Sequence, residues 1–368
     1  MKVLVAGDWH SELHEEVVAA ALRRLGHAVD ELRWCRFFED APGSGSPMAR
    51  LARRAQNKYL VGPVLARVNR QLQQQALAFQ PDVVFIYRGT HIRAATLRAL
   101  KRALPQCVLV GYNNDDPFSP EHPRYLWRHF LAVVPHYDLV LAYRHGNIDE
   151  YRRAGAQRVA LLRSWYVPQR NYPAVLTPAE QAMFDTDVVF VGHYEADQRL
   201  DFLEEVVRQG FRLRLFGPGY DWDPVLRQSA VLRHLVPVRL VWGEEYNRAL
   251  CGARIALCFF SKLNRDTYTR RCFEIPASGS LLLSEHSDDL AGLYREGVEA
   301  DFFRSRDEMI AKIRHYLGAP QRRDAVAAAG RARVQADGHD VDSRMRQVLQ
   351  WADAIRAGHA LPISDGFS

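Results

Sequence analysis

A short stretch of the chain, DTYTRRCFEIPASGS at residues 266–280, combines side chains that could bind an anionic, hydroxyl-rich ligand. It holds two carboxylates, Asp266 and Glu274, and two guanidiniums, Arg270 and Arg271. Arginine donates charge-assisted hydrogen bonds to phosphate oxygens, and a carboxylate can accept hydrogen bonds from sugar hydroxyls. The combination is typical of a nucleotide site. A simpler interpretation stays open, in which Glu274 is a surface acid paired with Arg271.

The position of this stretch after a strand supports the same chemistry. The apolar run RIALCFF at residues 254–260 is typical of a buried strand, so the stretch follows that strand's carboxyl end. Glu274 would lie in the first turn of the next helix, where it can accept hydrogen bonds from the two hydroxyls of a ribose. Backbone N–H groups around Thr269 and Arg270 could bind a diphosphate. Gly279 would let the backbone pass close to a neighbour where the short helix ends.

Other strand-like runs end in glycine, at Gly7, Gly192 and Gly217. Doubly wound sheets bind ligands at the carboxyl ends of their strands, so the glycines mark the same kind of edge. Neither Gly7 nor Gly192 begins a G-x-G-x-x-G fingerprint, which disfavours a nicotinamide-dependent enzyme. The sequence also lacks a P-loop, a G-x-S-x-G elbow and an H-E-x-x-H motif.

The elements that must position these residues alternate regularly between strand and helix. The alternation breaks at the proline-rich, polar stretch 166–181, which has the composition of a linker, and restarts at residue 187. Ser11 is the expected N-cap of the first helix and Gly26 its C-terminal glycine. Alternating strands and helices predict parallel sheets with helices on both faces. The expected strands lie at residues 2–6, 28–34, 81–87, 107–112, 138–143, 158–165, 187–193, 212–219, 254–260 and 280–285, and the expected helices at 11–27, 94–104, 146–155, 198–210, 245–253, 273–279, 306–317 and 340–358.

The predicted fold class is therefore α/β, with two doubly wound, Rossmann-like domains. We assign the first to residues 1–170 and the second to residues 185–340, with a C-terminal helix and tail at 341–368 that cross back to the first domain. A length of 368 residues, with 48% of them apolar, suits two globular cores. When two such domains face each other, the cleft between them is the expected ligand site.

Composition indicates the compartment. No run of 18 apolar residues is present, and the opening MKVLVAG is too short for a signal peptide, so we expect a cytoplasmic protein. The five cysteines are odd in number and show no metal-ligand spacing, which favours free thiols in a reducing compartment.

The net charge of +6 is unevenly distributed. Residues 1–170 carry 24 Lys and Arg against 15 Asp and Glu, whereas residues 171–368 carry 25 against 28. Much of the basic excess lies in residues 50–71. This segment is either a solvated helix face, which is the simpler interpretation, or a basic amphipathic helix pair at an anionic membrane or acidic acceptor. Nucleic acid is disfavoured because no basic–aromatic array or zinc spacing accompanies the charge.

Taken together, these pieces resemble a known family. Two similar domains, an aspartate and a glutamate separated by seven residues, the run RRCFEIPASGS and a closing C-terminal helix are similar to GT-B glycosyltransferases, and in detail to the CgeB-like group of spore-maturation proteins. The resemblance covers most of residues 187–350. The first half matches mainly in strand order and in GYNNDDP at residues 111–117.

The resemblance implies a nucleoside-diphosphate sugar in the second domain and an acceptor in the first. Related families use an E-x7-E pair for the donor. Glu274 matches the ribose position, whereas Asp266 is one methylene shorter than the expected glutamate. These families also place a basic residue after the first strand of the second domain to meet the diphosphate. Arg199 is the nearest candidate here, and His193, beside Gly192, could share the task.

Transfer with inversion would need a base near the acceptor hydroxyl. Candidates in the first domain are Asp115 and Asp116, in NNDDP after a strand, followed by His10 and His91. In the alternative interpretation, the Asp-Pro step at Asp116 is a turn that Asp115 caps, and the histidines are solvated loop residues. No D-x-D motif follows a strand, so catalysis without a metal ion or other cofactor is expected.

The sequence thus predicts a bacterial, cytoplasmic glycosyltransferase of polysaccharide or glycoconjugate biosynthesis. It would move a sugar from a nucleotide sugar to a glycan, lipid-linked, protein or small-molecule acceptor, without nucleic-acid partners and with residues 50–71 available for peripheral contact with the inner membrane. Two alternatives stay open, namely a non-catalytic protein that binds sugar nucleotides or glycans, and a sugar-nucleotide epimerase of the same architecture.

Overall fold

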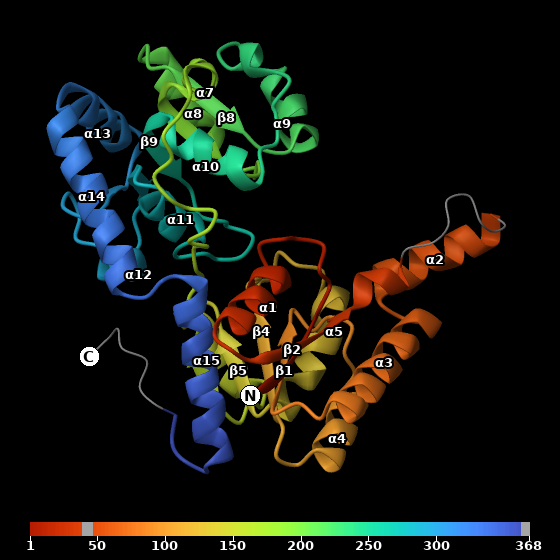
Figure 1. Cartoon of the computed structure of the whole chain (residues 1–368). Coiled ribbons are helices and arrows are strands. Elements are labelled where there is room, and N and C mark those ends of the chain that lie inside the picture. The colour runs from red at the N-terminus through yellow and green to blue at the C-terminus, as the bar shows by residue number, and fades with distance from the viewer. Residues whose placement is uncertain (39–46, 362–368) are drawn as a thin grey trace. The chain divides into compact units, whose positions relative to one another are not determined.

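The computed structural model describes residues 1–38 and 47–361 and divides the chain into two compact units (Figure 1). Unit 1 comprises Met1–Arg163 together with the C-terminal segment from Val341, and unit 2 comprises Ser164–Asp340. Each unit contains one parallel sheet connected through helices.

The sheet of unit 1 has six strands in the order β2-β1-β3-β4-β5-β6. Its central strands are buried along their whole length, as expected of a parallel sheet with both faces covered. The strands are β1 (Lys2–Gly7), β2 (Ala28–Arg33), β3 (Val83–Tyr87), β4 (Val108–Asn113), β5 (Leu139–Ala142) and β6 (Val159–Leu161). The helices are α1 (Glu15–Arg24), α2 (Pro47–Tyr59), α3 (Pro63–Phe79), α4 (Ala94–Ala103), α5 (Arg124–Val133), α6 (His145–Arg153) and α15 (Val341–Arg356), with short 3-10 helices at Trp34–Phe37 and Val134–His136.

Unit 2 has a five-stranded sheet in the order β11-β10-β9-β7-β8. Its core is formed by apolar side chains of β7, β9 and β10 and of the helices packed on them. The strands are β7 (Thr186–Val191), β8 (Leu213–Phe216), β9 (Ala253–Cys258), β10 (Leu281–Glu285) and β11 (Asp301–Phe303). The helices are α7 (Pro178–Phe184), α8 (Arg199–Arg208), α9 (Gly219–Leu226), α10 (Gly243–Cys251), α11 (Arg271–Ala277), α12 (Asp288–Leu293), α13 (Arg306–Gly318) and α14 (Pro320–Ala336), with a 3-10 helix at Arg233–Leu235.

The predicted fold class is confirmed, since both sheets are parallel and strands alternate with helices. The start of the first helix was predicted wrongly. Helix α1 begins at Glu15, and the Ser11 hydroxyl instead accepts a hydrogen bond from the Leu13 N–H in the preceding turn. The Glu15 carboxylate is buried and accepts a hydrogen bond from the Asp8 N–H, so the turn that follows β1 is tied to the helix start. Gly26, with φ +83°, follows the helix C-terminus as expected.

The proline-rich stretch 166–181 is packed onto unit 2. Tyr166 forms a β-bridge with Asp340, and the side-chain amide of Asn247 bonds the backbone N–H and C=O of Tyr172. Helix α7 begins inside the stretch, at Pro178, with a capping box before it. The composition that predicted a linker therefore belongs to a segment that unit 2 holds at Tyr166 and Tyr172 and that continues into α7.

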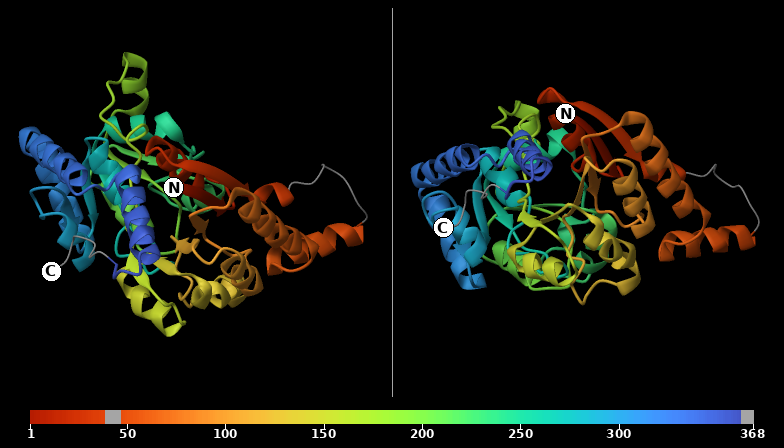
Figure 2. Two further views of the ribbon diagram at one scale, coloured as in Figure 1. Left: turned by 60° about the horizontal axis from the view of Figure 1, so that its bottom comes forward. Right: turned by 90° about the horizontal axis from the view of Figure 1, so that it is seen from below.

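Helix α15, which comes last in the chain, also belongs to unit 1. It lies against α1 in all three views (Figures 1 and 2), and Arg24 of α1 forms an ion pair with Asp342 of α15.

All five cysteines of the chain are free thiols, as predicted. In the described parts of the chain, no helix combines the length and apolar character needed to span a bilayer.

Candidate functional site

The edge of unit 2 where ligands are expected lies between β7 and β9. Strand β7 pairs with β8 on one side and β9 on the other, so the winding direction changes there. Doubly wound sheets bind ligands outside the carboxyl ends of their strands at such a point. Arg271 occupies it: its guanidinium donates to the carbonyl of Val191 at 3.1 Å and to that of Phe259 at 3.4 Å. Arg271 therefore connects the ends of the two strands.

Gly192 and Gly217 leave room for this arrangement. A Cβ on Gly192 would lie 2.7 Å from a guanidinium nitrogen of Arg271, and one on Gly217 would lie 2.2 Å from the carbonyl oxygen of Gly192. That same oxygen accepts a hydrogen bond from the Trp222 indole at 2.8 Å. Both glycines thus serve close packing of strand ends.

Gly217→Ala should lower the free energy of unfolding by about 1–3 kcal/mol, because a methyl group would collide with backbone that cannot move away. Chemical denaturation monitored by circular dichroism measures the change. Gly146→Ala is the matched control: Gly146 lies in α6, its added Cβ would meet nothing within 4 Å, and its stability should be unchanged or slightly higher. Equal effects at the two positions would contradict the packing argument.

Glu274 lies in the first turn of α11, as predicted, and is buried. Its Oε2 accepts a hydrogen bond of 2.7 Å from the hydroxyl of Tyr246 on α10. Burial raises the pKa of Glu274, while the positive charges of Arg270 and Arg271 and the Tyr246 hydroxyl act in the opposite direction. The carboxylate is therefore held at a fixed position in a positively charged surrounding.

The other residues of the opening stretch have varied positions. Asp266 is partly buried in the loop between β9 and α11, and the guanidinium of Arg270 lies over the ring of Trp165 at 5.6 Å. Thr269 is buried and its backbone N–H is directed at the Cys272 sulfur, which argues against the expected diphosphate contact from this N–H. Gly279 has φ +77° at the end of α11.

The two basic residues predicted to contact the diphosphate after β7, Arg199 and His193, have different surroundings. Arg199 is buried and its guanidinium is occupied by the Asp197 carboxylate and by the carbonyls of His193 and Phe260, so it braces the loop after β7. The geometry therefore argues against Arg199 as a ligand contact. The imidazole of His193 is exposed and is hydrogen-bonded to Asp221.

Two residues of this edge were missed by sequence reasoning. Tyr246 lies 28 residues before Glu274, and no local spacing links them. Lys262 follows β9, is 54% exposed and forms an ion pair with Glu285 at the end of β10. A lysine two residues after the end of an expected strand was the signal that could have identified Lys262.

The corresponding edge of unit 1 lies where β1, β3 and β4 end. There the Asp115 carboxylate forms an ion pair of 2.6 Å with Arg88, and Asp8 bonds His10 at 3.0 Å. Burial alone would raise the pKa of Asp8, but the hydrogen bond from His10 and the nearby charges, that of Arg88 included, lower it. The same hydrogen bond raises the pKa of His10. The structure thus brings Asp115 and His10 to one polar edge.

His91 and Asp116 have more enclosed environments. His91 packs against Trp34 and Phe38, and burial lowers its pKa to about 4, so the imidazole is neutral near pH 7. Asp116 is fully buried and accepts hydrogen bonds from the backbone N–H of Phe118 and from the amide of Asn147. Its burial argues against a catalytic role and favours the turn interpretation.

Strain and unmatched polar atoms mark this edge as well. Trp9 and Arg88 have φ of 60° and 62°, a left-handed conformation that is costly for residues other than glycine. Within residues 1–38 and 47–361, Nε of Arg88, Nδ2 of Asn113 and Oδ1 of Asn114 are buried without a hydrogen-bond partner. Strained backbone of this kind clusters at active sites and ligand-binding sites.

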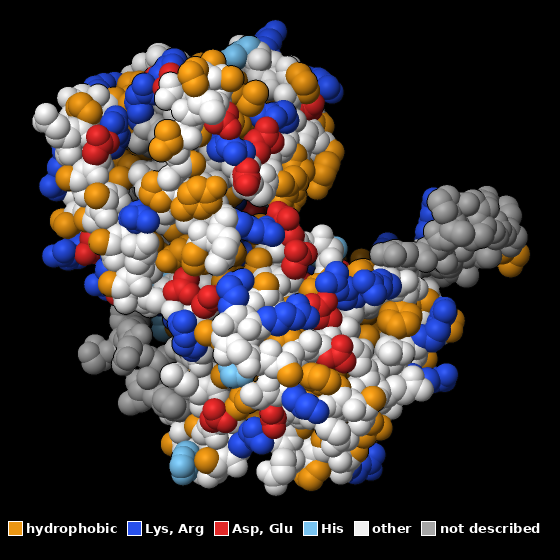
Figure 3. Space-filling view, viewed as in Figure 1, with side chains coloured by type: hydrophobic (Ala, Val, Ile, Leu, Met, Phe, Trp, Pro, Cys, Tyr) orange, Lys and Arg blue, Asp and Glu red, His pale blue; other side chains and the backbone are white. Residues whose placement is uncertain are grey.

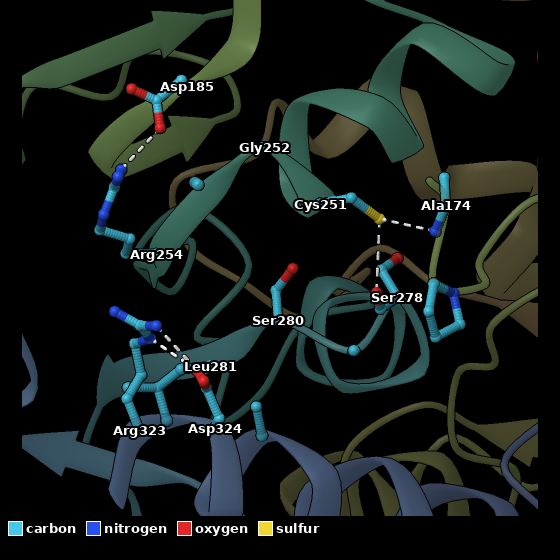
Figure 4. Close-up of a pocket in the computed structure, with 14 residues that line it drawn as sticks. Ala174, Asp185, Cys251, Gly252, Arg254, Ser278, Ser280, Leu281, Arg323 and Asp324 are labelled. Atoms are coloured by element: carbon cyan, nitrogen blue, oxygen red, sulfur yellow. Dashed lines mark hydrogen bonds and ion pairs between the residues drawn. The ribbon is translucent and has the colours of Figure 1, made fainter. Parts of the chain in front are cut away.

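A polar cavity of about 390 Å³ lies at the opposite edge of the sheet of unit 2, where β9 and β10 begin (Figure 4). Figure 4 shows Arg254 and Arg323 on one side and Cys251 on the other. Arg254 pairs with Asp185 and Arg323 with Asp324. Because doubly wound sheets bind ligands at the carboxyl ends of their strands and this cavity lies at the amino ends, we assign no role to it.

Comparisons with known proteins agree with this fold. Residues 198–350 match the family model described as glycosyl transferase-like, and this match does not identify the CgeB-like group. No curated protein matches the sequence.

Similar solved structures cover nearly the whole chain. They include sucrose-phosphate synthase from Thermosynechococcus elongatus (TM-score 0.67, 12% identity, 97% of this chain and 100% of that one). HepE of Anabaena in complex with UDP-glucose gives a TM-score of 0.66 at 14% identity, over 96% of this chain and 100% of that one. A glycosyltransferase from Rickettsia africae gives 0.66 at 12% identity, over 98% and 99%. The chain therefore has the two-domain α/β fold called GT-B.

Proposed function

We propose that this protein is a glycosyltransferase that binds a nucleoside-diphosphate sugar at unit 2 and transfers the sugar to a hydroxyl of an acceptor bound at unit 1. The observation that carries the proposal is the buried Glu274 carboxylate, positioned by Tyr246 beside Arg271 at the point where the sheet changes direction. The match of residues 198–350 to a glycosyl transferase-like model supports it, because that range contains all three residues.

Donor binding divides between two groups of residues. The Glu274 carboxylate accepts hydrogen bonds from the ribose hydroxyls, and Arg271 and Lys262 meet the diphosphate. Arg270 and the exposed imidazole of His193 are further basic side chains of this edge. UDP-sugars are the first donors to test, because the similar HepE structure contains UDP-glucose.

The chemistry breaks the bond between the anomeric carbon and the diphosphate oxygen and forms a bond from that carbon to the acceptor oxygen. Negative charge grows on the leaving diphosphate, and fixed positive groups such as Arg271 stabilise it. The proton of the acceptor hydroxyl passes to a base of unit 1, for which Asp115 is our choice. Its ion pair with Arg88 holds the carboxylate in place.

A nucleotide screen tests the proposal. UDP, GDP, dTDP and CMP are each added in a thermal-shift assay, and the bound nucleotide should raise the melting temperature by mass action. The matching nucleotide sugars are then incubated with and without acceptor extracts. Nucleotide release that depends on acceptor supports a transferase, an isomerised sugar without acceptor indicates an epimerase, and binding without turnover indicates a binding protein.

Turnover should not depend on a divalent metal ion, since we assign charge neutralisation at the diphosphate to Arg271 and Lys262. Activity after treatment with EDTA and gel filtration should equal that of the untreated protein. Loss of activity that added Mg²⁺ or Mn²⁺ restores would refute this part of the proposal.

A further inference from the structure

The segment between Asp40 and Asp82 has an unusual charge pattern. Its 41 residues contain six basic residues and no acidic one. This surplus equals the net charge of the entire chain, +6. The basic residues are Arg50, Arg53, Arg54, Lys58, Arg67 and Arg70. Helices α2 and α3 lie within this segment.

Helix α2 also exposes large apolar side chains. Met48 is 82% exposed, Leu51 67% and Tyr59 43%. At about 100° per residue these three positions share one side of the helix, and Lys58 and Arg54 border it along the edge next to Leu51. Single exposed apolar residues need no explanation, but an apolar side bordered by basic residues is typical of helices that lie in a membrane surface.

The attachment of α2 leaves Met48 and Leu51 of that side uncovered. Among the described residues, the contacts of the helix with α5 lie at its C-terminal end, where Arg128 and His129 bond the carbonyl of Leu60 and the Tyr59 ring contacts Tyr125 at 5.3 Å. Figures 1 and 2 show α2 extending away from the rest of unit 1 in three directions of view. Figure 3 shows further Lys and Arg side chains on the face of unit 1 beside this helix.

We propose that α2 docks on the surface of a bilayer that contains anionic lipids, with Met48 and Leu51 among the acyl chains and Arg54 and Lys58 at the lipid phosphates. The charge pattern favours an anionic surface, and the apolar side chains favour one with an apolar interior. A nucleic acid would use the charges but would leave Met48 and Leu51 exposed. A solvated helix face would explain the charges only.

The anchor of α2 connects it to the polar edge of unit 1. Tyr125, which contacts α2, and Trp127 lie two residues apart on α5, and the Trp127 ring lies against the Arg88 guanidinium at 5.6 Å. Arg88 holds Asp115. The docking helix and the Asp115 edge are therefore joined through one helix, α5, within unit 1. Resting on the proposed function, this placement selects a lipid-linked acceptor whose hydroxyl stands at the headgroup level.

Vesicle flotation tests the docking without any donor or acceptor. Vesicles of phosphatidylcholine, with or without phosphatidylglycerol, are mixed with the full chain. Wild type should float with the anionic vesicles, less so as salt increases. Arg54→Gln with Lys58→Gln should weaken this binding about 30-fold, since each basic residue near an anionic surface contributes about fivefold to the membrane affinity. Met48→Asp with Leu51→Asp should weaken it by at least about tenfold.

Matched controls exclude general effects. Val175→Asp changes an apolar residue that is 98% exposed, and Arg152→Gln removes an exposed charge of α6. Both variants should float as wild type does. The α2 variants should keep the circular-dichroism spectrum and melting temperature of wild type, which shows that they are folded.

Several outcomes would overturn the docking proposal. One is wild-type protein that does not float with anionic vesicles at low salt, and another is a control variant that loses as much binding as the α2 variants. Binding of an RNA oligonucleotide in place of vesicles would assign the charges to nucleic acid. A dimer that Met48→Asp with Leu51→Asp converts to a monomer would assign the apolar side to a second copy. Because flotation needs no turnover, vesicle binding by a protein that transfers no sugar would refute the proposed function while leaving the docking intact.

Discussion

Asp115→Asn should reduce turnover about 10²–10⁴-fold, the range expected for loss of a general base, while donor affinity stays unchanged. The reason is positional. Asp115 follows β4 in unit 1 and is held by Arg88, whereas the proposed donor contacts all belong to unit 2. Asparagine keeps the shape of the side chain and can still accept a hydrogen bond from Arg88, but it cannot take a proton from the acceptor hydroxyl.

Steady-state kinetics with saturating donor measure this effect, and calorimetry with the nucleotide alone checks the donor site. Asp149→Asn is the control, because Asp149 is an exposed carboxylate of α6 that pairs with Arg152. Asp116→Asn should affect stability more than turnover, since that carboxylate is buried in the turn. Near-full turnover in Asp115→Asn would contradict the assignment and move it to the Asp8–His10 pair.

Glu274→Ala should weaken nucleoside-diphosphate binding by about 1–3 kcal/mol, the contribution of hydrogen bonds to a charged group, which corresponds to roughly 5–150-fold in Kd. Titration calorimetry of the folded variant gives the affinity directly. Tyr246→Phe removes the hydroxyl that positions the carboxylate and should weaken binding less, because the carboxylate itself remains. Unchanged affinity in both variants would rule out a ribose contact by Glu274.

The protonation of Glu274 gives a second measurement. Burial raises the pKa of this carboxyl group, so it should lose its charge, and with it part of the ribose contact, at a higher pH than an exposed glutamate would. Nucleotide affinity should therefore fall more steeply on acidification in wild type than in Glu274→Gln. Protonation of the nucleotide's own phosphate affects both proteins alike, so the difference between the two profiles isolates Glu274.

The same pKa shift predicts an effect on folding. A carboxyl group whose pKa is raised in the folded state favours folding most at low pH, and this contribution is lost as the pH rises through the raised pKa. Relative to wild type, Glu274→Gln should therefore be more stable at neutral pH than at acidic pH. Denaturation curves at the two pH values check the sign, and an opposite trend would show that the surrounding arginines outweigh burial.

Local pattern in the sequence determined most elements that build the fold. The continuous apolar runs of β3, β9 and β10 identify buried strands, since a parallel sheet covered on both faces needs apolar side chains on both. The position of Glu274 in the first turn of the helix that follows β9 was also predicted from the order of elements. These features depend on residues that are close in the sequence, so the pattern of apolar residues is enough to predict them.

Elements without such a pattern escaped prediction. Helix α14 is rich in alanine and arginine and has no clear apolar stripe, and α9 contains Pro224 and begins at Gly219. Both are helical because they are packed against the sheet or its helices: α14 lies on α11, and Trp222 of α9 is fully buried in the core. Tertiary contacts overrode weak local preference.

The partners of the candidate site residues were decided by tertiary structure alone. Arg271 reaches the carbonyl of Val191, 80 residues away, because β7 and β9 are neighbours in the sheet although β8 lies between them in the chain. Two arginines that each follow a strand in the sequence therefore have different roles. The Arg199 guanidinium is hydrogen-bonded within its own loop, whereas Arg271 joins two strand ends at the ligand edge. Strand order depends on packing across the whole unit, and no local spacing of residues encodes it.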